Sequence, residues 1–163
     1  MTTVEENTKA YDTRSEENKA IIRRFIKSYN DRNLDIFEEL VSPDYVDHTH
    51  GTKGREAFKA LFTMAFEGFP DWFEDIQEII AEGDRVWVRV IATGTHTGDW
   101  NLMGTPLPAT GRKVRMEMVF IWKIVDGKLI EGREVDESVD FLRQLGLVKY
   151  TEKGKKVFAE IKK

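Results

Sequence analysis

Apolar residues recur at helical spacing three times in the first half of the chain. A first helix is expected from about residue 16 onward, and its apolar stripe consists of Ala20, Ile21, Phe25, Ile26 and Tyr29. A short second helix is expected over 34–41, and Ser42-Pro43 stops it because proline lacks an N–H and restricts the residue before it. A third helix is expected over 54–66. The segment 44–51 is too short and polar for a helix, and we interpret it as an edge strand or a loop.

The period of the apolar residues changes to two after residue 72. Such alternation is typical of half-buried antiparallel strands, and we expect strands over 72–80, 85–95, 113–125 and 128–136. Residues 98–111 are interpreted as a long loop, and 139–145 as a short closing helix. Helices followed by mainly antiparallel strands predict an α+β fold, with the helices packed on one face of a curved sheet.

The last two strands are joined by Asp126-Gly127, a strong two-residue hairpin signal. Counting outward from this turn sets the cross-strand pairs Phe120–Arg133, Met118–Val135 and Met116–Glu137. Glu137 then lies at the rim of an apolar face, where loss of hydration raises a carboxyl pKa and suits a general acid or base. Glu134 and Asp136 fall on the solvated face. A β-bulge in this hairpin would shift the register by one residue and exchange the two faces.

Composition and charge exclude several classes of protein. The 163 residues suffice for one domain with a real core, and 25 Lys+Arg against 29 Asp+Glu give a net charge of −4, which does not indicate nucleic-acid binding. The absence of Cys excludes disulfide scaffolds, thiolate nucleophiles and Cys-ligated metals. Neither a membrane span nor a secretory signal is found, so a cytoplasmic protein is expected.

The common cofactor and nucleophile motifs are also missing. The sequence has no Gly-rich phosphate loop and no G-x-S-x-G elbow. His48 and His50 would share one face of a strand and could reach a metal together, but His96 is far away in the sequence. Because so few ligands of the usual type are available, we expect no functional metal and no cofactor.

The domain is expected to span 16–148, between two tails. Residues 1–15 are polar and weakly patterned, which indicates a flexible tail, and the Lys-rich residues 149–163 are interpreted as a tail or an amphipathic helix. Within the sheet, alternation places Trp87, Ile91, Val119 and Ile121 on the face away from the helices. An apolar surface of that extent predicts a homodimer.

Several short motifs in this chain occur together in one known family. They are Tyr45-Val46-Asp47-His48, Phe69-Pro70-Asp71-Trp72, Glu82-Gly83-Asp84-Arg85-Val86, Thr93-Gly94-Thr95-His96-Thr97-Gly98, Thr110-Gly111-Arg112, Asp126-Gly127-Lys128 and Gln144-Leu145-Gly146. Over about residues 16–148 the chain resembles the SnoaL-like polyketide cyclases, also called ester cyclases. So many motifs in the right order are specific for the family, and they are less specific for the reaction.

The resemblance implies a cone-shaped α+β fold like that of nuclear transport factor 2 and ketosteroid isomerase. A strongly curved antiparallel sheet would wrap three N-terminal helices around an apolar pocket, and dimers or tetramers would form through the sheet. The characterised cyclases of the family close a polyketide ring by intramolecular aldol condensation, without metal or organic cofactor. In them an Asp near the end of the last strand removes a proton alpha to a carbonyl, and neighbouring donors hold the enolate oxygen.

The resemblance also assigns candidate site residues, counted back from Gln144-Leu145-Gly146. Glu137 takes the position of the family's Asp and Arg133 that of its Trp, while Trp100 is a candidate lid. The catalytic candidates are Glu137, Glu134, Asp136 and His48. The candidates for substrate binding are Tyr45, Trp72, His96, Trp100, Met103, Met116, Met118, Phe120 and Arg133.

The function expected from the resemblance is cofactor-free acid/base catalysis, as in an aldol-type cyclase or an isomerase. The expected partner is a small hydrophobic or carbonyl-containing molecule. Two alternatives remain: a non-catalytic module of the same fold that binds a hydrophobic ligand or a partner, and a hydrolase or dehydratase that uses the same carboxylate. A carboxylate that faces the pocket within reach of a hydrogen-bond donor would distinguish the enzyme from the binding module.

Overall fold

The structure is a computed structural model, and it describes residues 4–102 and 104–161. Helices and strands follow one another in the order α1 (Val4–Asn30), α2 (Ile36–Leu40), β1 (Val41–Asp47), α3 (Arg55–Gly68), β2 (Phe73–Glu82), β3 (Arg85–Thr95), β4 (Trp100–Leu102), β5 (Thr105–Leu107), β6 (Lys113–Val125), β7 (Lys128–Asp136), α4 (Ser138–Gln144) and α5 (Glu152–Ile161).

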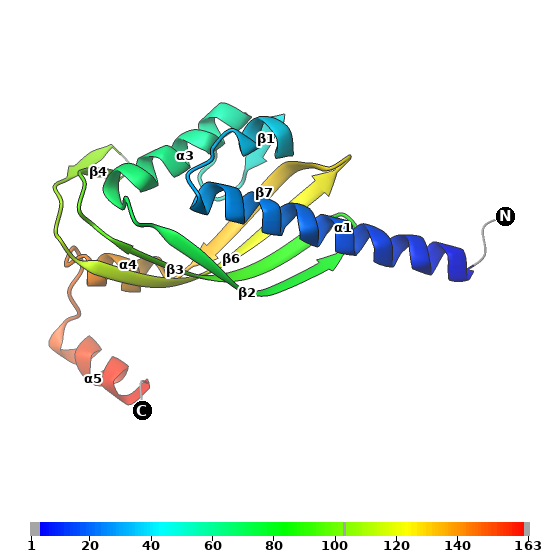
Figure 1. The fold of residues 1–163 in the computed structure, drawn as a ribbon. Coiled ribbons are helices and arrows are strands. Elements are labelled where there is room, and N and C mark those ends of the chain that lie inside the picture. Colours follow the sequence, from blue (N-terminus) through cyan, green and yellow to red (C-terminus); the bar gives the residue numbers. More distant parts are fainter. Residues whose placement is uncertain (1–3, 103, 162–163) are drawn as a thin grey trace.

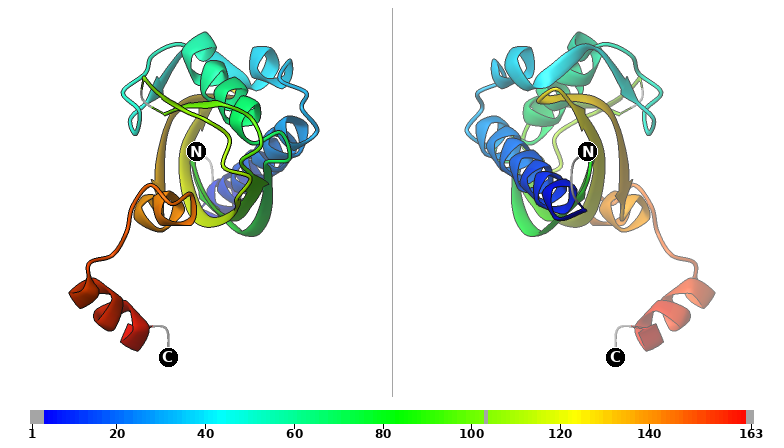
Figure 2. Two further views of the ribbon diagram at one scale, coloured as in Figure 1. Left: turned by 90° about the vertical axis from the view of Figure 1, so that its left-hand side faces the viewer. Right: turned by 90° about the vertical axis from the view of Figure 1, so that its right-hand side faces the viewer.

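The main sheet has the strand order β1-β7-β6-β3-β2 and is strongly curved (Figure 1). Its long strands pair in antiparallel fashion, as expected, while β1 runs parallel to β7. Helices α1 and α3 lie on the concave side, and α5 stands apart from the sheet (Figure 2). The α+β architecture predicted from the sequence is therefore confirmed.

Two elements differ from the expectation. Helix α1 begins at Val4 instead of near residue 16, because the polar residues of this stretch include good helix formers and extend the helix past the sheet (Figure 1). The stretch 98–111 is no simple loop, since β4 and β5 form a small hairpin within it. None of the helices formed by residues 4–102 and 104–161 has the length and apolar character needed to cross a membrane.

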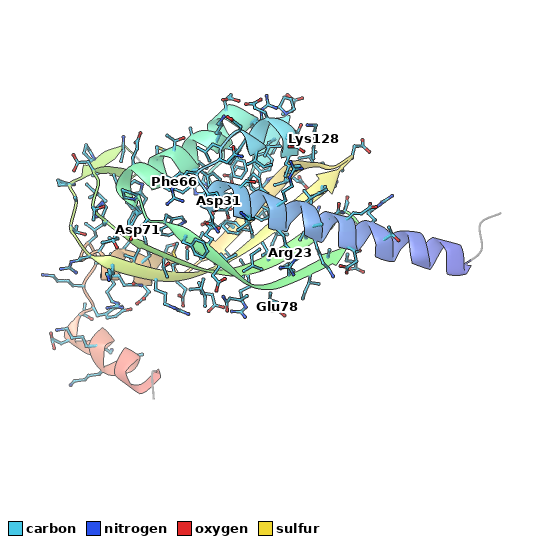
Figure 3. All side chains as sticks on the ribbon, viewed as in Figure 1. Arg23, Asp31, Phe66, Asp71, Glu78 and Lys128 are labelled. Carbon is cyan, nitrogen blue, oxygen red and sulfur yellow. The ribbon has the colours of Figure 1, made fainter. Side chains whose placement is uncertain are left out.

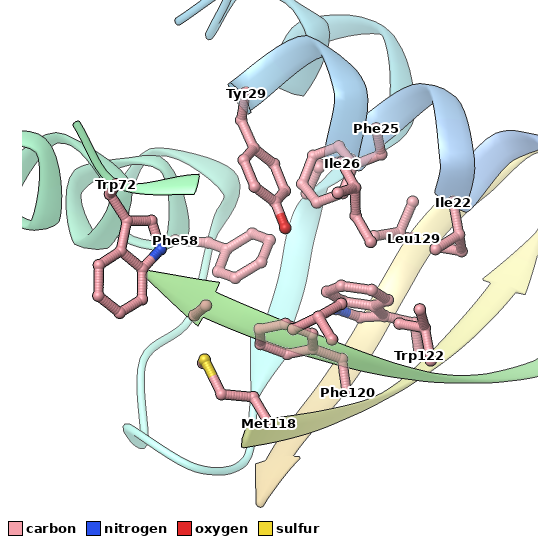
Figure 4. Packing of buried hydrophobic residues seen from close by; sticks show 14 of the residues in the cluster. Ile22, Phe25, Ile26, Tyr29, Phe58, Trp72, Met118, Phe120, Trp122 and Leu129 are labelled. Carbon is pink, nitrogen blue, oxygen red and sulfur yellow. The ribbon is translucent and has the colours of Figure 1, made fainter. Parts of the chain in front are cut away.

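The core lies between the concave face of the sheet and helices α1 and α3. Alternate residues of β3 and β6 point inward and are almost fully buried, among them Val88, Val90, Met118, Phe120 and Trp122. The apolar stripe of α1 packs onto this face, and the ring of Phe25 lies 5.9 Å from that of Trp122 (Figure 4). The predicted alternation of β3 and β6 is confirmed, and their inner residues form an aromatic interior.

The register of the β6–β7 hairpin is shifted by one residue from the count made outward from Asp126-Gly127. The pairing is irregular between Lys123 and Ile124, and beyond that point Phe120 lies opposite Glu134. The pairs predicted from the sequence, Phe120–Arg133, Met118–Val135 and Met116–Glu137, are therefore wrong.

The shift has a packing reason at Gly132, which lies opposite Trp122 on the inner face. A Cβ atom at this position would come within 2.6 Å of Cδ1 of Trp122 and would collide with the hydroxyl of Tyr45. Only a glycine allows Tyr45 and Trp122 to approach the strand this closely. The irregular pairing places Gly132 opposite Trp122, where that close approach is needed.

Candidate active site

The shifted register turns two carboxyls of β7 toward the interior. Glu134 pairs with Phe120 and Asp136 with Met118, so both acids share the face of these buried apolar residues. The Glu134 side chain is partly exposed but has protein on most sides. Burial, followed by the nearby charge of Glu74, raises the pKa of Glu134 to about 8. A carboxyl with such a pKa exchanges protons readily near neutral pH.

Asp136 marks the end of β7 and the start of α4. One of its carboxylate oxygens accepts hydrogen bonds from the backbone N–H of Ser138, at 2.8 Å, and from the Ser138 hydroxyl. An open groove of about 290 Å³ adjoins this turn, and it is lined by Asp136, Glu137, Ser138, Val139, Asp140 and Tyr150. Asp136 is therefore fixed by the turn, and it is one of the residues that line the groove.

A histidine–aspartate pair lies beside these carboxyls, in the turn that follows β1. Nδ1 of His50 lies 2.8 Å from Oδ2 of Asp47, whose other oxygen accepts the backbone N–H groups of Thr49 and His50. The hydrogen bond to Asp47 raises the pKa of His50, and the charges of Glu134 and Asp136 act in the same direction. His50 is 42% exposed. It is thus a solvent-accessible proton donor near the inner face of β7.

Backbone contacts hold this turn against β7. The backbone N–H of His48 donates to the carbonyl oxygen of Gly132 at 3.0 Å. The backbone N–H of Glu134 donates to the hydroxyl of Thr49 at 2.7 Å. Parallel pairing of β1 with β7 therefore brings residues that are about eighty positions apart in sequence into one site.

A third carboxyl, Glu74 of β2, is buried on the opposite side of the interior and is only 4% exposed. One of its oxygens accepts a hydrogen bond from the hydroxyl of Tyr29, and the other accepts the indole N–H of Trp72 at 3.0 Å. Burial raises the pKa of Glu74, and the two hydrogen bonds oppose this rise. Its charge is one of the causes that raise the pKa of Glu134.

Three candidates from the sequence lie away from the interior. Glu137 follows β7 and accepts the backbone N–H of Glu117 at 3.2 Å, so it does not share the face of Met116 and Met118. Arg133 is exposed on the outer face, opposite Ile121. Nε2 of His48 lies 3.1 Å from Glu131, another residue outside the inner face. The one-residue shift explains the places of Glu137 and Arg133. His48 directly follows β1, and its side chain points to Glu131 and not to the inner face.

Most apolar candidates for substrate binding do face the interior. Met116, Met118 and Phe120 are at most 6% exposed on the inner side of β6. Tyr45 is buried, and its hydroxyl accepts the indole N–H of Trp122 at 3.2 Å. Burial raises the pKa of Tyr45, so this phenol stays protonated. Trp72 is joined to the site through Glu74.

The remaining candidates lie near the β4–β5 hairpin. His96 is fully buried, stacks on Phe69 at 4.9 Å and pairs through Nδ1 with the hydroxyl of Thr110 at 3.1 Å. Burial lowers the pKa of His96, and its Nε2 has no hydrogen-bond partner among the residues that the structure describes. Trp100 is half-buried, and its ring packs against Phe69 at 5.4 Å. Met103 lies outside the described residues.

The residues that sequence reasoning missed are Tyr29, Asp47, His50 and Glu74. Alternation offered a signal for Glu74. Every second side chain of a strand points to the same face, so a strand with Trp72 and Ile76 on its inner face also has Glu74 there. The sequence places His50 beside His48 in a loop, as a pocket-lining residue or a metal ligand, and gives no signal for its pairing with Asp47. Across residues 4–102 and 104–161, no three or more His, Asp or Glu side chains are grouped so that they could hold a metal ion.

Comparisons with known proteins agree with this geometry. Residues 19–145 match the family described as SnoaL-like polyketide cyclase. Aklanonic acid methyl ester cyclase DauD of Streptomyces sp. (strain C5) is 33% identical over 133 residues, which cover 77% of this chain and 80% of the relative.

Two solved structures from Streptomyces are similar over most of the chain. AclR of Streptomyces galilaeus has a TM-score of 0.75 at 27% identity, covering 90% of this chain and 92% of that one. IdmH of Streptomyces antibioticus has a TM-score of 0.66 at 29% identity, covering 79% of this chain and 98% of that one. The family match and the two structural matches each span most of this chain.

Proposed function

Because the chain belongs to the SnoaL-like polyketide cyclase family, we propose that it closes a ring in a polyketide-derived ester by an intramolecular aldol reaction. The observation that carries this proposal is the position of Glu134: an inward carboxyl with a pKa of about 8, on an apolar face and beside a histidine. General acid/base catalysis works best when the pKa of the catalytic group lies near the working pH.

The proposed reaction needs only proton transfer and carbon–carbon bond formation. Glu134 removes a proton from the carbon alpha to a carbonyl, and the resulting enolate attacks a second carbonyl carbon of the same molecule. The oxygen of that second carbonyl becomes an alkoxide, which takes up a proton to give a hydroxyl. His50, held by Asp47, donates a hydrogen bond to the enolate oxygen and supplies this proton. The product is an isomer of the substrate, so no oxidant, reductant or metal is consumed.

The substrate class follows from the walls of the site and from the relatives. The inner residues of β6 and the rings of α1 and α3 offer an aromatic and thioether surface, which suits a flat, conjugated polyketide. DauD is named a cyclase of aklanonic acid methyl ester, and this ester is the probe that we choose for assays.

Replacement of one carboxyl tests the proposal. Glu134→Gln keeps the shape of the side chain and removes its basicity, so turnover of the probe should fall by about 10²–10⁴-fold while probe affinity changes little. Glu131→Gln is the matched control, because Glu131 lies on the same strand and pairs with Arg85 and His48 outside the interior. Turnover in the control should stay within about twofold of the wild type.

Two other outcomes would contradict this proposal, the first its function and the second its assignment of the base. If the wild-type protein binds the probe and does not convert it, the fold serves as a binding module for hydrophobic ligands. If Glu134→Gln turns over the probe at the wild-type rate, the base lies elsewhere in the site.

We also propose that two copies of the chain associate through the convex face of the sheet. Ile80 and Trp87 are neighbours on adjacent strands and are 57% and 51% exposed, and Ile121 lies next to Trp87 on β6. Arg89 pairs with Glu78 and Glu117 at the border of this patch. Figure 3 shows Glu78 at the lower edge of the sheet, below α1. An apolar centre with a charged border is typical of a protein interface.

A further inference from the structure

The inner face of β3 leads to a histidine with an unused hydrogen-bond donor. Buried residues alternate along β3, and His96 continues this row beyond Ala92 and Gly94 with no exposure to solvent. The backbone N–H of Thr110 donates to Nδ1 of His96 at 3.4 Å, and the Thr110 hydroxyl lies 3.1 Å from the same atom. Because Nδ1 accepts, the neutral ring carries its proton on Nε2. This Nε2 finds no hydrogen-bond partner within 4–102 and 104–161.

Four aromatic rings gather at this end of the interior, and we call them the aromatic cage: Phe69, Trp72, Trp100 and Phe141. Phe69 stacks on the imidazole of His96 at 4.9 Å, and Trp100 meets it edge-on at 6.3 Å. Phe141 lies 5.8 Å from both Phe69 and Trp100, and Trp72 lies 5.5 Å from Phe69. Such rings offer a proton only weak acceptors. Buried polar groups of native proteins are nearly always paired, so the unused Nε2–H indicates a place for a partner.

One wall of the aromatic cage is a short hairpin outside the main sheet. Strands β4 and β5 form a two-stranded sheet of their own, beside α3 at one end of the molecule (Figure 1). Trp100 of β4 is half-buried, whereas Phe69 and Phe141 are buried. Trp100 packs on Gly68 at the end of α3, where a Cβ atom would lie 2.7 Å from that of Trp100. An isolated two-stranded hairpin is only marginally stable, so this wall is the part of the cage that can yield to a ligand.

We propose that the aromatic cage binds one end of a flat aromatic carbonyl compound, and that Nε2–H of His96 donates a hydrogen bond to its carbonyl oxygen. The rings supply a stacking surface, and the oxygen is the acceptor that Nε2 lacks. His96 follows Val90 by six residues, and Val90 pairs with Met118, which lies opposite Asp136. This separation is roughly 20 Å along the strand, so His96 contacts the end of the substrate remote from the reacting carbons. The inference rests on the proposed function only for the identity of that substrate.

Two fluorescent probes that differ in one carbonyl oxygen test this assignment. 2-Acetylanthracene carries a carbonyl group on a flat ring system, and 2-ethylanthracene does not. His96→Asn keeps an acceptor near the position of Nδ1 and removes Nε2. Its affinity for 2-acetylanthracene should fall about tenfold, while its affinity for 2-ethylanthracene stays within about twofold. His48→Asn is the matched control, because it makes the same substitution outside the inner face, and neither affinity should change.

Three results would overturn the inference. The first is an unchanged affinity of His96→Asn for 2-acetylanthracene. The second is an equal loss of affinity for both probes, because the substitution then disturbs only the packing of the cage. The third is a wild-type protein that binds neither probe.

An NMR measurement on the wild-type protein keeps the test decisive if His96→Asn fails to fold. With ¹⁵N-labelled histidine rings, the His96 ring proton is recognised by its slow exchange with water, since the side chains of His48 and His50 are 34% and 42% exposed. This proton should reside on Nε2 and shift downfield with 2-acetylanthracene and not with 2-ethylanthracene. A histidine that only contacts the ring faces through N–H···π interactions would respond alike to both probes, which would overturn the inference.

Kinetics with the ester probe separate this inference from the proposed function. Because the contact is remote from the reacting carbons, His96→Asn should raise KM about tenfold and leave kcat within about twofold of the wild type. An unchanged KM in a protein that closes the ring would leave the cyclase standing and refute the carbonyl contact. Loss of probe discrimination in His96→Asn, in a protein that closes no ring, would leave the carbonyl contact standing and refute the cyclase.

Discussion

Glu134 illustrates how a single residue acquires a chemical role from its surroundings. A glutamate on an exposed strand would be ionised at neutral pH, and burial between an aromatic strand and two other acids reverses this preference. The same change has a cost in stability. Because the folded protein holds the Glu134 proton more tightly than the unfolded chain does, folding is disfavoured once that proton must be lost.

The pH dependence of stability should report this effect. The folded-state pKa of about 8 lies above the ordinary value of 4.5, so the stabilisation is complete below that ordinary value and is lost as the pH rises through the folded-state pKa. From about pH 5 to about pH 9, the wild type should lose on the order of 2 kcal/mol more unfolding free energy than Glu134→Gln, after allowance for the partial exposure of the side chain. Urea unfolding at several pH values measures the difference, and parallel curves for the two proteins would contradict the assignment.

The strands and helices show which parts of the structure the sequence could predict. The alternation of apolar residues along β3 and β6 correctly predicts which face of the sheet is buried. Such a pattern can be read from one strand alone, and in these two strands it continues over many residues. The turn at Asp126-Gly127 was predicted correctly, but the irregular pairing at Lys123 and Ile124 follows from the packing of Trp122 and Tyr45 on Gly132, which no local pattern encodes. This single residue of register decides whether Glu137 or Glu134 faces the interior.

Local sequence patterns also do not indicate which distant strands pair with each other. The segment 44–51, predicted to be an edge strand or a loop, overlaps β1, which does lie at the edge of the sheet. Its parallel pairing with β7 depends on contacts across more than eighty residues, and the sequence did not predict it. That pairing brings His50 and Asp47 to the carboxyls of β7. The family motifs marked this segment correctly, but they favoured His48, which lies on the other side of β1 beside Glu131.

At the scale of the whole molecule, the fold separates two surfaces of the sheet. The concave face carries the aromatic interior and its acids, and the convex face carries the patch of Ile80, Trp87 and Ile121. Closure of the concave face by α1 and α3 leaves the convex face as the surface on which a second copy can pack (Figure 2).

Light scattering of sized protein tests the predicted dimer. The wild type should run as a dimer at micromolar concentration, and Trp87→Glu should weaken association at least about tenfold because it places a charge in the centre of the patch. Val125→Glu is the control, since Val125 is 40% exposed at the hairpin tip and lies outside the patch. A monomeric wild type, or equal weakening by both substitutions, would contradict this interface.

The most direct test of the central claim follows the alpha proton itself. A substrate analogue that lacks the second carbonyl cannot cyclise, but its alpha proton still exchanges with heavy water when an enzyme base removes it. The wild type and Glu137→Gln should catalyse this exchange, measured by NMR, and Glu134→Gln should be slower by about 10²–10⁴-fold. Exchange at the wild-type rate in Glu134→Gln, or its loss in Glu137→Gln, would contradict the assignment of Glu134 as the base.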